Sequence, residues 1–311
     1  MLISVIIPCY NVRRAILKRC IDSLTPLNSL CSWEAWLIDD GSQEDWICNW
    51  VKENGTPHLH AFRQENQGQG AARNAGIDRA QGDYIVFLDA DDELAFPAYI
   101  EVVSLLQTHK YDAVSYLHEK QHRNHVDMEC SGTQYMAHYD ISGAPWSHAI
   151  RREILGTLRF TPGIFHEDEE FNARMLLKVK RIRVTRLTAY RYHLDPMSTV
   201  HNPDERHLRK RFRDLAGIIA RMGHLKAEVG TEESLALSRR ISVLAMNYVI
   251  NVMRDGKSHA FRNECLDLLA IQGLYPLPLR GVSPIYMATS LLTHYRWQLN
   301  LLSPLITRLL H

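Results

Sequence analysis

The stretch from Tyr84 to Asp92 reads YIVFLDADD and joins an apolar run directly to three carboxylates. Residues 84–88 are all aromatic or aliphatic, which is typical of a strand that is buried on both faces. Carboxylates this close repel one another unless water or a cation stabilises them, and Mg²⁺ or Mn²⁺ prefers such oxygen ligands. The end of this strand therefore indicates either a divalent metal site or an acidic turn that leads into a helix. This segment alone leaves both open.

Short apolar runs and segments of helical spacing alternate along the first part of the chain. The predicted strands are Leu2–Pro8, Glu34–Asp40, His58–Phe62, Asp83–Leu88 and Tyr111–Tyr116. The predicted helices are Ala15–Leu24, Glu44–Glu53, Gly70–Ala80 and Pro97–Thr108. This alternation of apolar strands with helices predicts an α/β fold, in which a mainly parallel sheet is covered by helices on both faces. Ligands bind beyond the carboxyl ends of the strands in such sheets, so polar residues that follow strands are the candidates for a site.

Two further segments carry polar residues at such places. Residues 35–42 read AWLIDDGS, in which Asp39 or Asp40 can accept a hydrogen bond from a nucleotide base or a ribose hydroxyl. The alternative is a helix cap, which Ser42 supplies by itself. Residues 66–76 read NQGQGAARNAG, and glycines at a helix start followed by Arg73 suit an anionic or ribose-bearing ligand. This pattern is neither the dinucleotide-binding fingerprint nor a P-loop.

The order of these elements resembles that of the family 2 glycosyltransferases. The segments that carry the resemblance are residues 8–11 (PCYN), 39–42 (DDGS), 70–76 (GAARNAG) and 88–92 (LDADD). The resemblance is dense over residues 1–115 and continues more thinly to about residue 200. It implies the GT-A fold, a Rossmann-like mixed sheet, and transfer of a sugar from a nucleotide diphosphate donor with inversion. It also implies a Mn²⁺ or Mg²⁺ cofactor held at the D-x-D residues.

The same resemblance implies a role for each matching residue. For the nucleotide donor, the implied contacts are Pro8, Tyr10, Asn11, Asp39, Asp40, Arg73 and Asp89. Asp39 and Asp40 would lie against the base, usually uracil, while Asp89 would touch the ribose or the metal. Asp91 would be the principal metal ligand, with Asp89 beside it.

Residues 166–169 (HEDE) resemble the E-D motif at a helix start in this family, which implies that Asp168 is the general base. An attacking hydroxyl must lose its proton as it displaces the diphosphate, and a positioned carboxylate can accept that proton. The alternative is an exposed acidic first turn, which is favourable at a helix N-terminus. Weaker resemblances place Glu167, Trp146 and His193 at the acceptor or the diphosphate, His193 within a loop over residues 190–199. A structural role is the alternative for Trp146 and His193.

Charge divides the chain into two parts that the overall balance hides. The chain has 36 Lys and Arg and 35 Asp and Glu, which argues against a dedicated nucleic-acid binder. Residues 1–92 hold 8 basic and 13 acidic residues, whereas residues 178–226 hold 13 basic and 4 acidic. The basic stretch indicates a solvated helical face, or contact with anionic lipid or a phosphate-bearing acceptor. From Glu205 onward the pattern is helical, so we expect a GT-A domain over residues 1–204 and a helical extension over residues 205–311.

The apolar ends of the chain are not predicted to cross a membrane. The N-terminal run ends at Pro8 without a basic leader, and no stretch of about 18 uncharged apolar residues follows. Apolar residues from Leu291 to Leu309 recur at helical spacing, which predicts one stripe that contacts the core or a second subunit, or lies on a membrane surface. Six scattered cysteines without zinc spacing favour a reduced, cytoplasmic location.

The whole sequence therefore predicts an inverting glycosyltransferase whose donor is a nucleotide sugar, expected to be UDP-linked. The acceptor is expected to be a hydroxyl of a glycan or of a lipid-linked oligosaccharide, in the assembly of a bacterial surface polysaccharide. We expect the enzyme in the cytoplasm, or peripherally on the inner face of the cytoplasmic membrane. The alternatives are a polyprenyl-phosphate glycosyltransferase and a non-catalytic nucleotide-sugar-binding scaffold. A nucleotidyltransferase is disfavoured, because residues 8–11 are not its glycine-rich loop.

Overall fold

The computed structural model describes residues 1–119, 126–193, 204–256, 258–278 and 282–310. The chain forms two compact units. The first comprises Met1–Tyr135 and Ile141–Pro196, and the second comprises Met136–Asp140 and Met197–His311. The boundary that the sequence predicts between residues 204 and 205 stays a prediction, because the adjoining residues 194–203 lie outside the described part of the chain.

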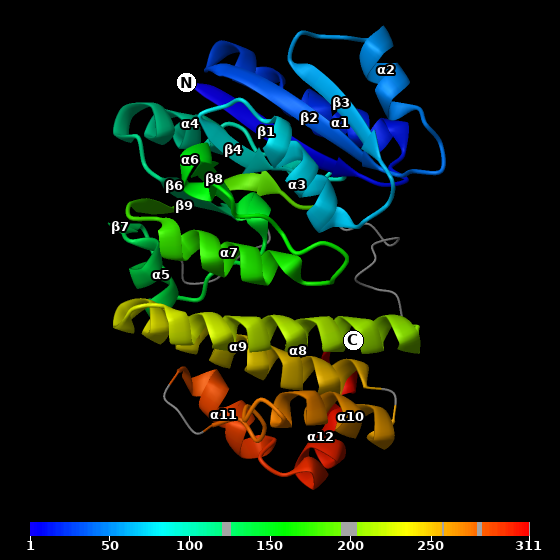
Figure 1. The fold of residues 1–311 in the computed structure, drawn as a ribbon, viewed down its shortest axis with the longest axis vertical. Coiled ribbons are helices and arrows are strands. Elements are labelled where there is room, and N and C mark those ends of the chain that lie inside the picture. The colour runs from blue at the N-terminus through cyan, green and yellow to red at the C-terminus, as the bar shows by residue number, and fades with distance from the viewer. Residues whose placement is uncertain (120–125, 194–203, 257, 279–281, 311) are drawn as a thin grey trace. The chain divides into compact units, whose positions relative to one another are not determined.

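The first unit is built on one mixed sheet (Figure 1). Its strands are β1 (Leu2–Cys9), β2 (Ser32–Asp40), β3 (Leu59–Gln64), β4 (Tyr84–Phe87), β5 (Glu93–Leu94), β6 (Ala113–His118), β7 (Met128–Cys130), β8 (His148–Arg151) and β9 (Ile182–Arg191). They lie in the order β3-β2-β1-β4-β8-β6-β9-β5, and β7 pairs with β9. Neighbours from β3 to β4 are parallel, whereas β8 runs antiparallel to both β4 and β6. The carboxyl ends of β1, β2 and β4 therefore meet at one edge of the sheet.

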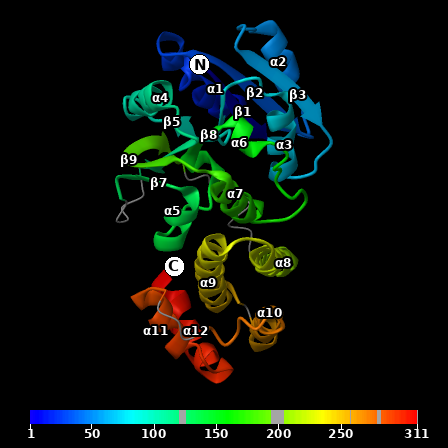
Figure 2. The same ribbon diagram turned by 60° about the vertical axis from the view of Figure 1, so that its left-hand side comes forward.

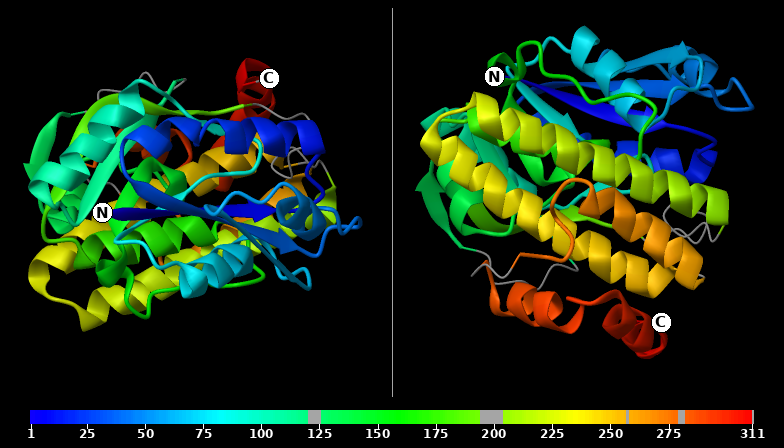
Figure 3. Two further views of the ribbon diagram at one scale, coloured as in Figure 1. Left: turned by 90° about the horizontal axis from the view of Figure 1, so that it is seen from above. Right: turned by 60° about the horizontal axis from the view of Figure 1, so that its bottom comes forward.

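Helices cover this sheet on both faces. They are α1 (Arg14–Asp22), η1 (Thr25–Ser29), α2 (Ile47–Glu53), α3 (Gln69–Arg79), α4 (Ala98–His109), α5 (Gly132–His138), η2 (Pro145–Ser147), α6 (Arg152–Leu155) and α7 (Glu167–Lys178). Figure 3 (left) shows α1 and α4 on one side of β1 and α3 on the other. Successive residues Val5, Ile6 and Ile7 are fully buried, as expected for a strand covered on both faces. Gly76 lets α3 approach β1, because a Cβ there would overlap Cγ2 of Ile6.

Every strand and helix predicted for residues 1–116 is present, with ends that shift by a few residues. The mixed α/β class with helices on both faces is thereby confirmed. β8 and β9, which supply antiparallel pairs, were not among the predicted strands. β8 has only four residues, and β9 carries Arg183, Arg186 and Arg191, so neither contains a long apolar run.

The second unit is helical. Its helices are α8 (Glu205–Glu228), α9 (Thr231–Asp255), α10 (His259–Ala270), α11 (Pro284–Leu292) and α12 (Arg296–Leu310). α8 and α9 lie side by side, α10 packs on both, and α11 and α12 pack against α9 (Figure 2). At the centre, the ring centroids of Tyr248 and Phe261 lie 5.1 and 5.9 Å from that of Phe212. Ser258 and Ser283 cap α10 and α11 by accepting backbone N–H groups.

The apolar residues near the end of the chain do not form the single stripe that the sequence predicts. α11 and α12 are separated by residues 293–295, where the carbonyl of Thr293 accepts a hydrogen bond from the hydroxyl of Tyr275 at 3.0 Å. Leu299 is fully buried, whereas Leu291 is 57% exposed. Among the described residues, no helix combines the length and the apolar character that a membrane span requires.

Candidate active site

The loops that follow β1 and β2 are fastened to each other at the carboxyl edge of the sheet. Asn11 has a left-handed backbone conformation (φ 48°), and its N–H donates to Oγ of Ser42 at 2.9 Å. Its side-chain Oδ1 accepts the N–H of Gln43 at 2.8 Å. Tyr10 beside this junction is 54% exposed, whereas Pro8 is buried in β1. Of these predicted nucleotide contacts, Tyr10 and Asn11 are exposed, whereas Pro8 is not.

Asp39 and Asp40, at the end of β2, are buried and direct their carboxylates into the protein. Asp39 forms an ion pair with Arg63 at 2.7 Å. Asp40 accepts the backbone N–H groups of Gln67 and Gly68 at 3.0 and 2.8 Å. The two carboxylates therefore hold the loops around the start of α3, and their predicted contact with the base stays a prediction.

The first half of α3 joins that helix to the segment before α7. Asn74 binds both backbone groups of Phe160, because its Nδ2 donates to the carbonyl and its Oδ1 accepts the N–H, each at 2.8 Å. A Cβ at Gly70 would lie 2.9 Å from Cγ of Glu167, so glycine is needed for this close approach. The roles of Asn74 and Phe160 were not predicted from the sequence. Because Asn is a poor helix former, its place inside α3 was the available signal.

Arg73 connects the acidic end of β4 with the start of α7. Its Nη2 donates to Oδ1 of Asp89 and its Nη1 donates to Oε1 of Glu167, both at 3.0 Å. The side chain is only 3% exposed. Burial lowers the pKa of Arg73, but the carboxylates of Asp89 and Glu167 raise it by a larger amount. The pKa is therefore above its ordinary value, and the guanidinium stays charged. The contact of Arg73 with the nucleotide stays a prediction, since here its partners are these two carboxylates.

The first turn of α7 is strongly acidic, with Glu167, Asp168, Glu169 and Glu170 in succession. Oδ1 of Asp168 accepts the N–H of Glu169 at 2.9 Å. Desolvation, followed by the charges of Glu169 and Glu167, raises the pKa of Asp168 well above its ordinary range. Desolvation also raises the pKa of Glu167, although Arg73 opposes this shift. A carboxylate with raised proton affinity is suited to accept a proton from a hydroxyl near neutral pH.

Asp92, the third carboxylate after β4, is fully buried and anchors the strand end. Its Oδ2 accepts the hydroxyl of Tyr190 and its Oδ1 accepts the N–H of His193, both at 2.7 Å. Burial, followed by the charge of Asp89, raises the pKa of Asp92 to about 8, so this carboxyl is mostly protonated at neutral pH. Trp146 stacks on Tyr190 with ring centroids 4.2 Å apart and is 9% exposed. The acceptor role of Trp146 stays a prediction, and Tyr190 is a site residue that the sequence analysis missed.

His193 belongs to a cluster of charged residues next to β5. Its Nε2 lies 2.7 Å from Oε1 of Glu93, and Glu93 also pairs with Arg19 and Arg191 at 3.2 and 3.3 Å. The predicted contact of His193 with metal or phosphate stays a prediction. The remainder of the loop predicted over the diphosphate, residues 194–199, lies outside the described residues.

Several residues of the basic stretch 178–226 are paired with carboxylates. Arg181 contacts Glu129 at 2.5 Å, and Lys210 contacts Asp214 at 2.6 Å. Local carboxylates therefore neutralise part of the positive charge that the sequence places there. Contact of this stretch with anionic lipid or an anionic acceptor stays a prediction.

Asp89 and Asp91 lie at the end of β4 and are both partly exposed. Within the described residues, no three His, Cys, Asp or Glu side chains converge into a group that could hold a metal by itself. Mg²⁺ and Mn²⁺ at nucleotide sites commonly take one or two carboxylates and complete their shell with substrate phosphates and water. The hydrogen bonds that Gln69 and Arg73 donate to Asp89 both end on Oδ1. The carboxylates of Asp89 and Asp91 therefore fit a divalent ion that also binds a diphosphate.

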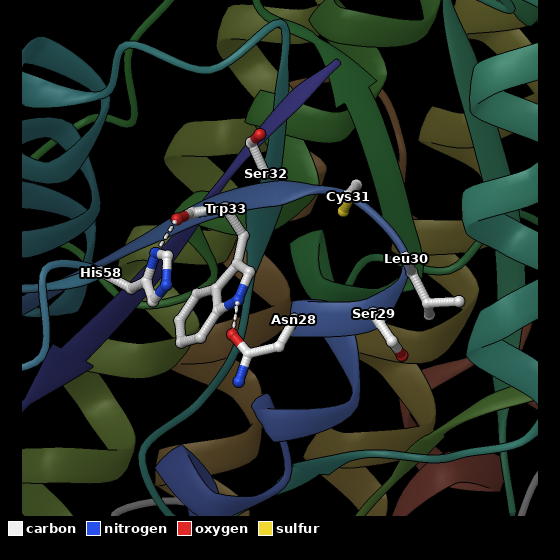
Figure 4. A pocket seen from close by; sticks show the side chains of 7 residues that line it. All are labelled: Asn28, Ser29, Leu30, Cys31, Ser32, Trp33 and His58. Carbon is white, nitrogen blue, oxygen red and sulfur yellow. Dashed lines mark hydrogen bonds between the residues drawn. The ribbon is translucent and has the colours of Figure 1, made fainter.

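A separate hollow of about 470 Å³ lies near the amino end of β2 (Figure 4). Its lining residues are Asn28, Ser29, Leu30, Cys31, Ser32, Trp33 and His58. Nε1 of Trp33 donates to Oδ1 of Asn28 at 2.9 Å, and Nδ1 of His58 lies 3.0 Å from the carbonyl oxygen of Trp33. A strand advances about 3.3 Å per residue, so Ser32 lies roughly 26 Å from Asp40. The hollow is thus remote from the acidic strand ends.

Comparison with known proteins places the chain in a family. The family model described as Glycosyl transferase family 2 matches residues 4–128. An uncharacterized glycosyltransferase of Haemophilus influenzae is 31% identical over 196 residues, which cover 58% of this chain and 74% of that protein. Two other curated relatives, each named an uncharacterized glycosyltransferase, are 26% identical, and the match spans 66% and 68% of their length. The chain therefore belongs to family 2 of the glycosyltransferases.

Solved structures share the fold over nearly the whole chain. TarS of Staphylococcus aureus in complex with UDP-GlcNAc has a TM-score of 0.71 at 17% identity, covering 99% of this chain and 91% of that chain. The mannosyltransferase PcManGT of Pyrobaculum calidifontis, in complex with GDP-Man and Mn²⁺, has a TM-score of 0.55 at 16% identity, covering 97% and 86%. The predicted GT-A fold with a helical C-terminal region is confirmed, and the family makes this protein a glycosyltransferase by enzyme class.

Proposed function

We propose that this protein transfers a sugar from a nucleotide diphosphate sugar to a hydroxyl group, with inversion at the anomeric carbon. The nucleotide that we expect is UDP, and the acceptor is a glycan or a lipid-linked oligosaccharide used in bacterial surface polysaccharide assembly. TarS was solved with UDP-GlcNAc and PcManGT with GDP-Man, and both support a nucleotide-sugar donor. The reaction is proposed to occur in the cytoplasm or at the inner face of the cytoplasmic membrane.

The bridge formed by Arg73 carries this proposal. Arg73 holds Asp89 and Glu167 at 3.0 Å each, which brings the carboxylates after β4 close to the first turn of α7. Asp168 is the residue next to Glu167 in that turn. A proton acceptor therefore lies near the carboxylates proposed to hold the metal. Displacement by a hydroxyl requires both kinds of group close together.

Asp168 is the general base in the proposed step. The acceptor oxygen attacks the anomeric carbon from the face opposite to the diphosphate, while Asp168 accepts the hydroxyl proton. The bond between the anomeric carbon and the diphosphate oxygen breaks as the new bond forms, so the centre is inverted. Desolvation raises the pKa of Asp168, which brings its proton affinity nearer to the working pH. Arg73 is a positioning residue, because it acts through Asp89 and Glu167.

Asp91 and Asp89 would hold the Mn²⁺ or Mg²⁺ ion. When bound, this ion would neutralise the negative charge that grows on the departing diphosphate. The chain fixes the strand end that carries these carboxylates through Asp92, which Tyr190 binds at 2.7 Å. The exposed ring of Tyr10 at the same sheet edge offers a face on which a nucleotide base can stack.

A panel of UDP- and GDP-sugars, assayed for nucleotide release with and without Mn²⁺, tests this function. Asp168→Asn should bind UDP with unchanged Kd but lose about 10²–10⁴-fold in transfer rate, because the proton acceptor is removed. Glu153→Gln is the matched control, since Glu153 is an exposed carboxylate in α6, and it should keep the wild-type rate. Unaffected transfer by Asp168→Asn would refute the assignment of the base.

The same panel separates the alternative functions. Transfer to a lipid phosphate instead of a hydroxyl would identify a polyprenyl-phosphate glycosyltransferase. Binding of UDP without turnover of any sugar, in the presence of Mn²⁺ or Mg²⁺, would favour a nucleotide-sugar-binding scaffold. A requirement for a divalent ion in both binding and turnover would support the metal role of Asp89 and Asp91.

A further inference from the structure

The most exposed residues of α11, of α12 and of the turn between them are all apolar or aromatic over the described positions. The exposed residues between positions 282 and 303 are Pro284, Ile285, Ala288, Leu291, Leu292, Tyr295, Trp297 and Leu301. In α11 their spacing is i, i+1, i+4, i+7 and i+8, which defines one face of a helix. In α12, Trp297 and Leu301 are one turn apart and share a face. We call this set of eight residues the apolar face.

The buried side of the same two helices contains polar residues. Oγ of Ser290 donates to the carbonyl of Leu277 at 2.7 Å, and Oγ of Ser303 donates to the carbonyl of Met253 at 2.6 Å. Both side chains are nearly fully buried. Tyr286 and Leu299 are buried beside these serines, so the buried side of the two helices is mixed, whereas the exposed positions are apolar. A helix in contact with water ordinarily exposes polar residues.

A helix of the same unit shows the ordinary arrangement. The exposed residues of α8 are Glu205, Arg206, Lys210, Arg213, Arg221, Gly223, His224, Ala227 and Glu228. Charged residues dominate this set, and it contains no large apolar residue. Figure 2 shows α8 and the pair α11 and α12 as separate layers of the helical unit. The apolar face is therefore a local feature of α11 and α12 and not a general property of the unit.

The charge of the surrounding sequence narrows the choice of partner. No Asp or Glu follows Asp267, whereas Arg280, Arg296 and Arg308 do. Arg296 pairs with Asp267 at 2.5 Å. Leucine, isoleucine and aromatic residues on one face, within an acid-free stretch that carries arginines, are typical of helices that lie in the headgroup region of an anionic bilayer.

The same charge argues against a second copy of this chain as the partner. A symmetric dimer through the apolar face would place the acid-free, arginine-bearing stretch against itself. That stretch has no carboxylate to pair with the partner's arginines, whereas anionic lipid headgroups supply negative charge. No described helix has the length and apolar character of a membrane span, so α11 and α12 are suited to lie on a bilayer surface.

We propose that α11 and α12 dock this protein on a membrane surface that contains anionic lipid. Trp297, Leu301 and the exposed side of α11 enter the boundary between headgroups and acyl chains. The net positive charge of the sequence after Asp267 favours contact with the phosphate groups. This inference rests on the proposed function, because docking on a membrane would bring the glycosyltransferase to a lipid-linked acceptor.

Flotation with lipid vesicles tests the proposal on the full chain. Wild-type protein should float with vesicles of phosphatidylcholine and phosphatidylglycerol, and less with phosphatidylcholine alone. Combined Trp297→Ser and Leu301→Ser substitutions should lower vesicle binding at least about tenfold, because two large apolar groups no longer insert. The matched control is Leu235→Ser, since Leu235 is 63% exposed in α9 outside the apolar face, and it should bind like the wild type.

Two further measurements keep this proposal separate from the proposed function. The double variant should keep the wild-type unfolding midpoint and its turnover with a water-soluble acceptor, while Asp168→Asn should still bind vesicles. Absence of wild-type binding to anionic vesicles would overturn the docking proposal, as would equal binding by the double variant. The docking proposal would also be overturned if the wild type formed a dimer in analytical ultracentrifugation, the double variant were a monomer, and the wild type did not bind vesicles. The partner of the apolar face would then be a second copy of this chain.

Discussion

The ends of β2 and β4 look alike in sequence but differ in the structure. Both strands are buried and both lead into closely spaced aspartates. Asp39 and Asp40, after β2, are 0% and 3% exposed, and they bind groups of their own loop and of the loop that follows β3. Asp89 and Asp91, after β4, keep partial exposure, and Arg73 connects Asp89 to α7. An acidic strand end is therefore a candidate site where its carboxylates stay accessible and meet a second acidic segment.

Among the changes that test this comparison, Asp91→Asn at the end of β4 is expected to have the largest effect. This change removes the charge assigned to metal binding and preserves the shape of the side chain. Loss of such a group at the departing diphosphate should lower the transfer rate by about 10²–10³-fold, with little change in Tm. A titration of rate against Mn²⁺ concentration should also show a higher metal requirement.

Asp22→Asn is the control for this variant, because Asp22 is an aspartate in α1 whose side chain is 59% exposed. It should leave both the rate and the metal requirement unchanged. A wild-type rate and metal requirement for Asp91→Asn would contradict the metal role of Asp91. The carboxylates at the end of β4 would then have only a structural role, like those at the end of β2.

At the end of β2, Asp40→Ala should weaken the fold more than the chemistry. The change leaves the amide of Gln64 and the backbone N–H groups of Gln67 and Gly68 without their buried acceptor. The free energy of unfolding should fall by about 2–4 kcal/mol, since one hydrogen bond to a charged group contributes about 1.5–3 kcal/mol. Urea unfolding measures this loss directly. Unchanged stability together with lost UDP binding would instead make the end of β2 a nucleotide contact.

The fold of the first unit was largely predictable because its signals are local. The apolar run of β1 and the helical spacing of α3 each lie within about a dozen residues, so strand and helix can be identified there from pattern alone. β8 and β9 have no such local signal, because one is short and the other carries three arginines. Pairing with β4 and β6 places them, and a single sequence does not display that pairing.

The candidate site was predictable in its residue types but not in its partnerships. The resemblance pointed to Asp89, Arg73 and Asp168 one by one. The ion pair of Arg73 with Glu167 joins residues 94 positions apart, and the hydrogen bond of Tyr190 with Asp92 joins residues 98 positions apart. Contacts at such separations follow from the packing of the whole sheet, so no spacing in the sequence reports them.

The smallest effect is expected from Glu169→Gln in the first turn of α7, which should shift the pH dependence of kcat/KM. Desolvation, then the charges of Glu169 and Glu167, raise the pKa of Asp168. The base acts as a carboxylate, so kcat/KM should fall as the pH is lowered through this raised pKa, with a midpoint above about 3.9, the ordinary aspartate value. Glu169→Gln removes a negative neighbour, so the midpoint should move to lower pH by a fraction of a unit.

Stability should respond to Glu169→Gln through the same group. A folded-state pKa above the unfolded value means that Asp168 favours the fold at low pH and that this contribution is lost as the pH rises through the raised pKa. Lowering that pKa should therefore raise the free energy of unfolding most clearly at pH values above it. Glu153→Gln, with its exposed carboxylate, should move neither the rate profile nor the stability curve. If Glu169→Gln leaves the midpoint of the low-pH fall in kcat/KM unchanged, the titrating group is not Asp168. The acidic turn of α7 would then have a structural role, like the carboxylates at the end of β2.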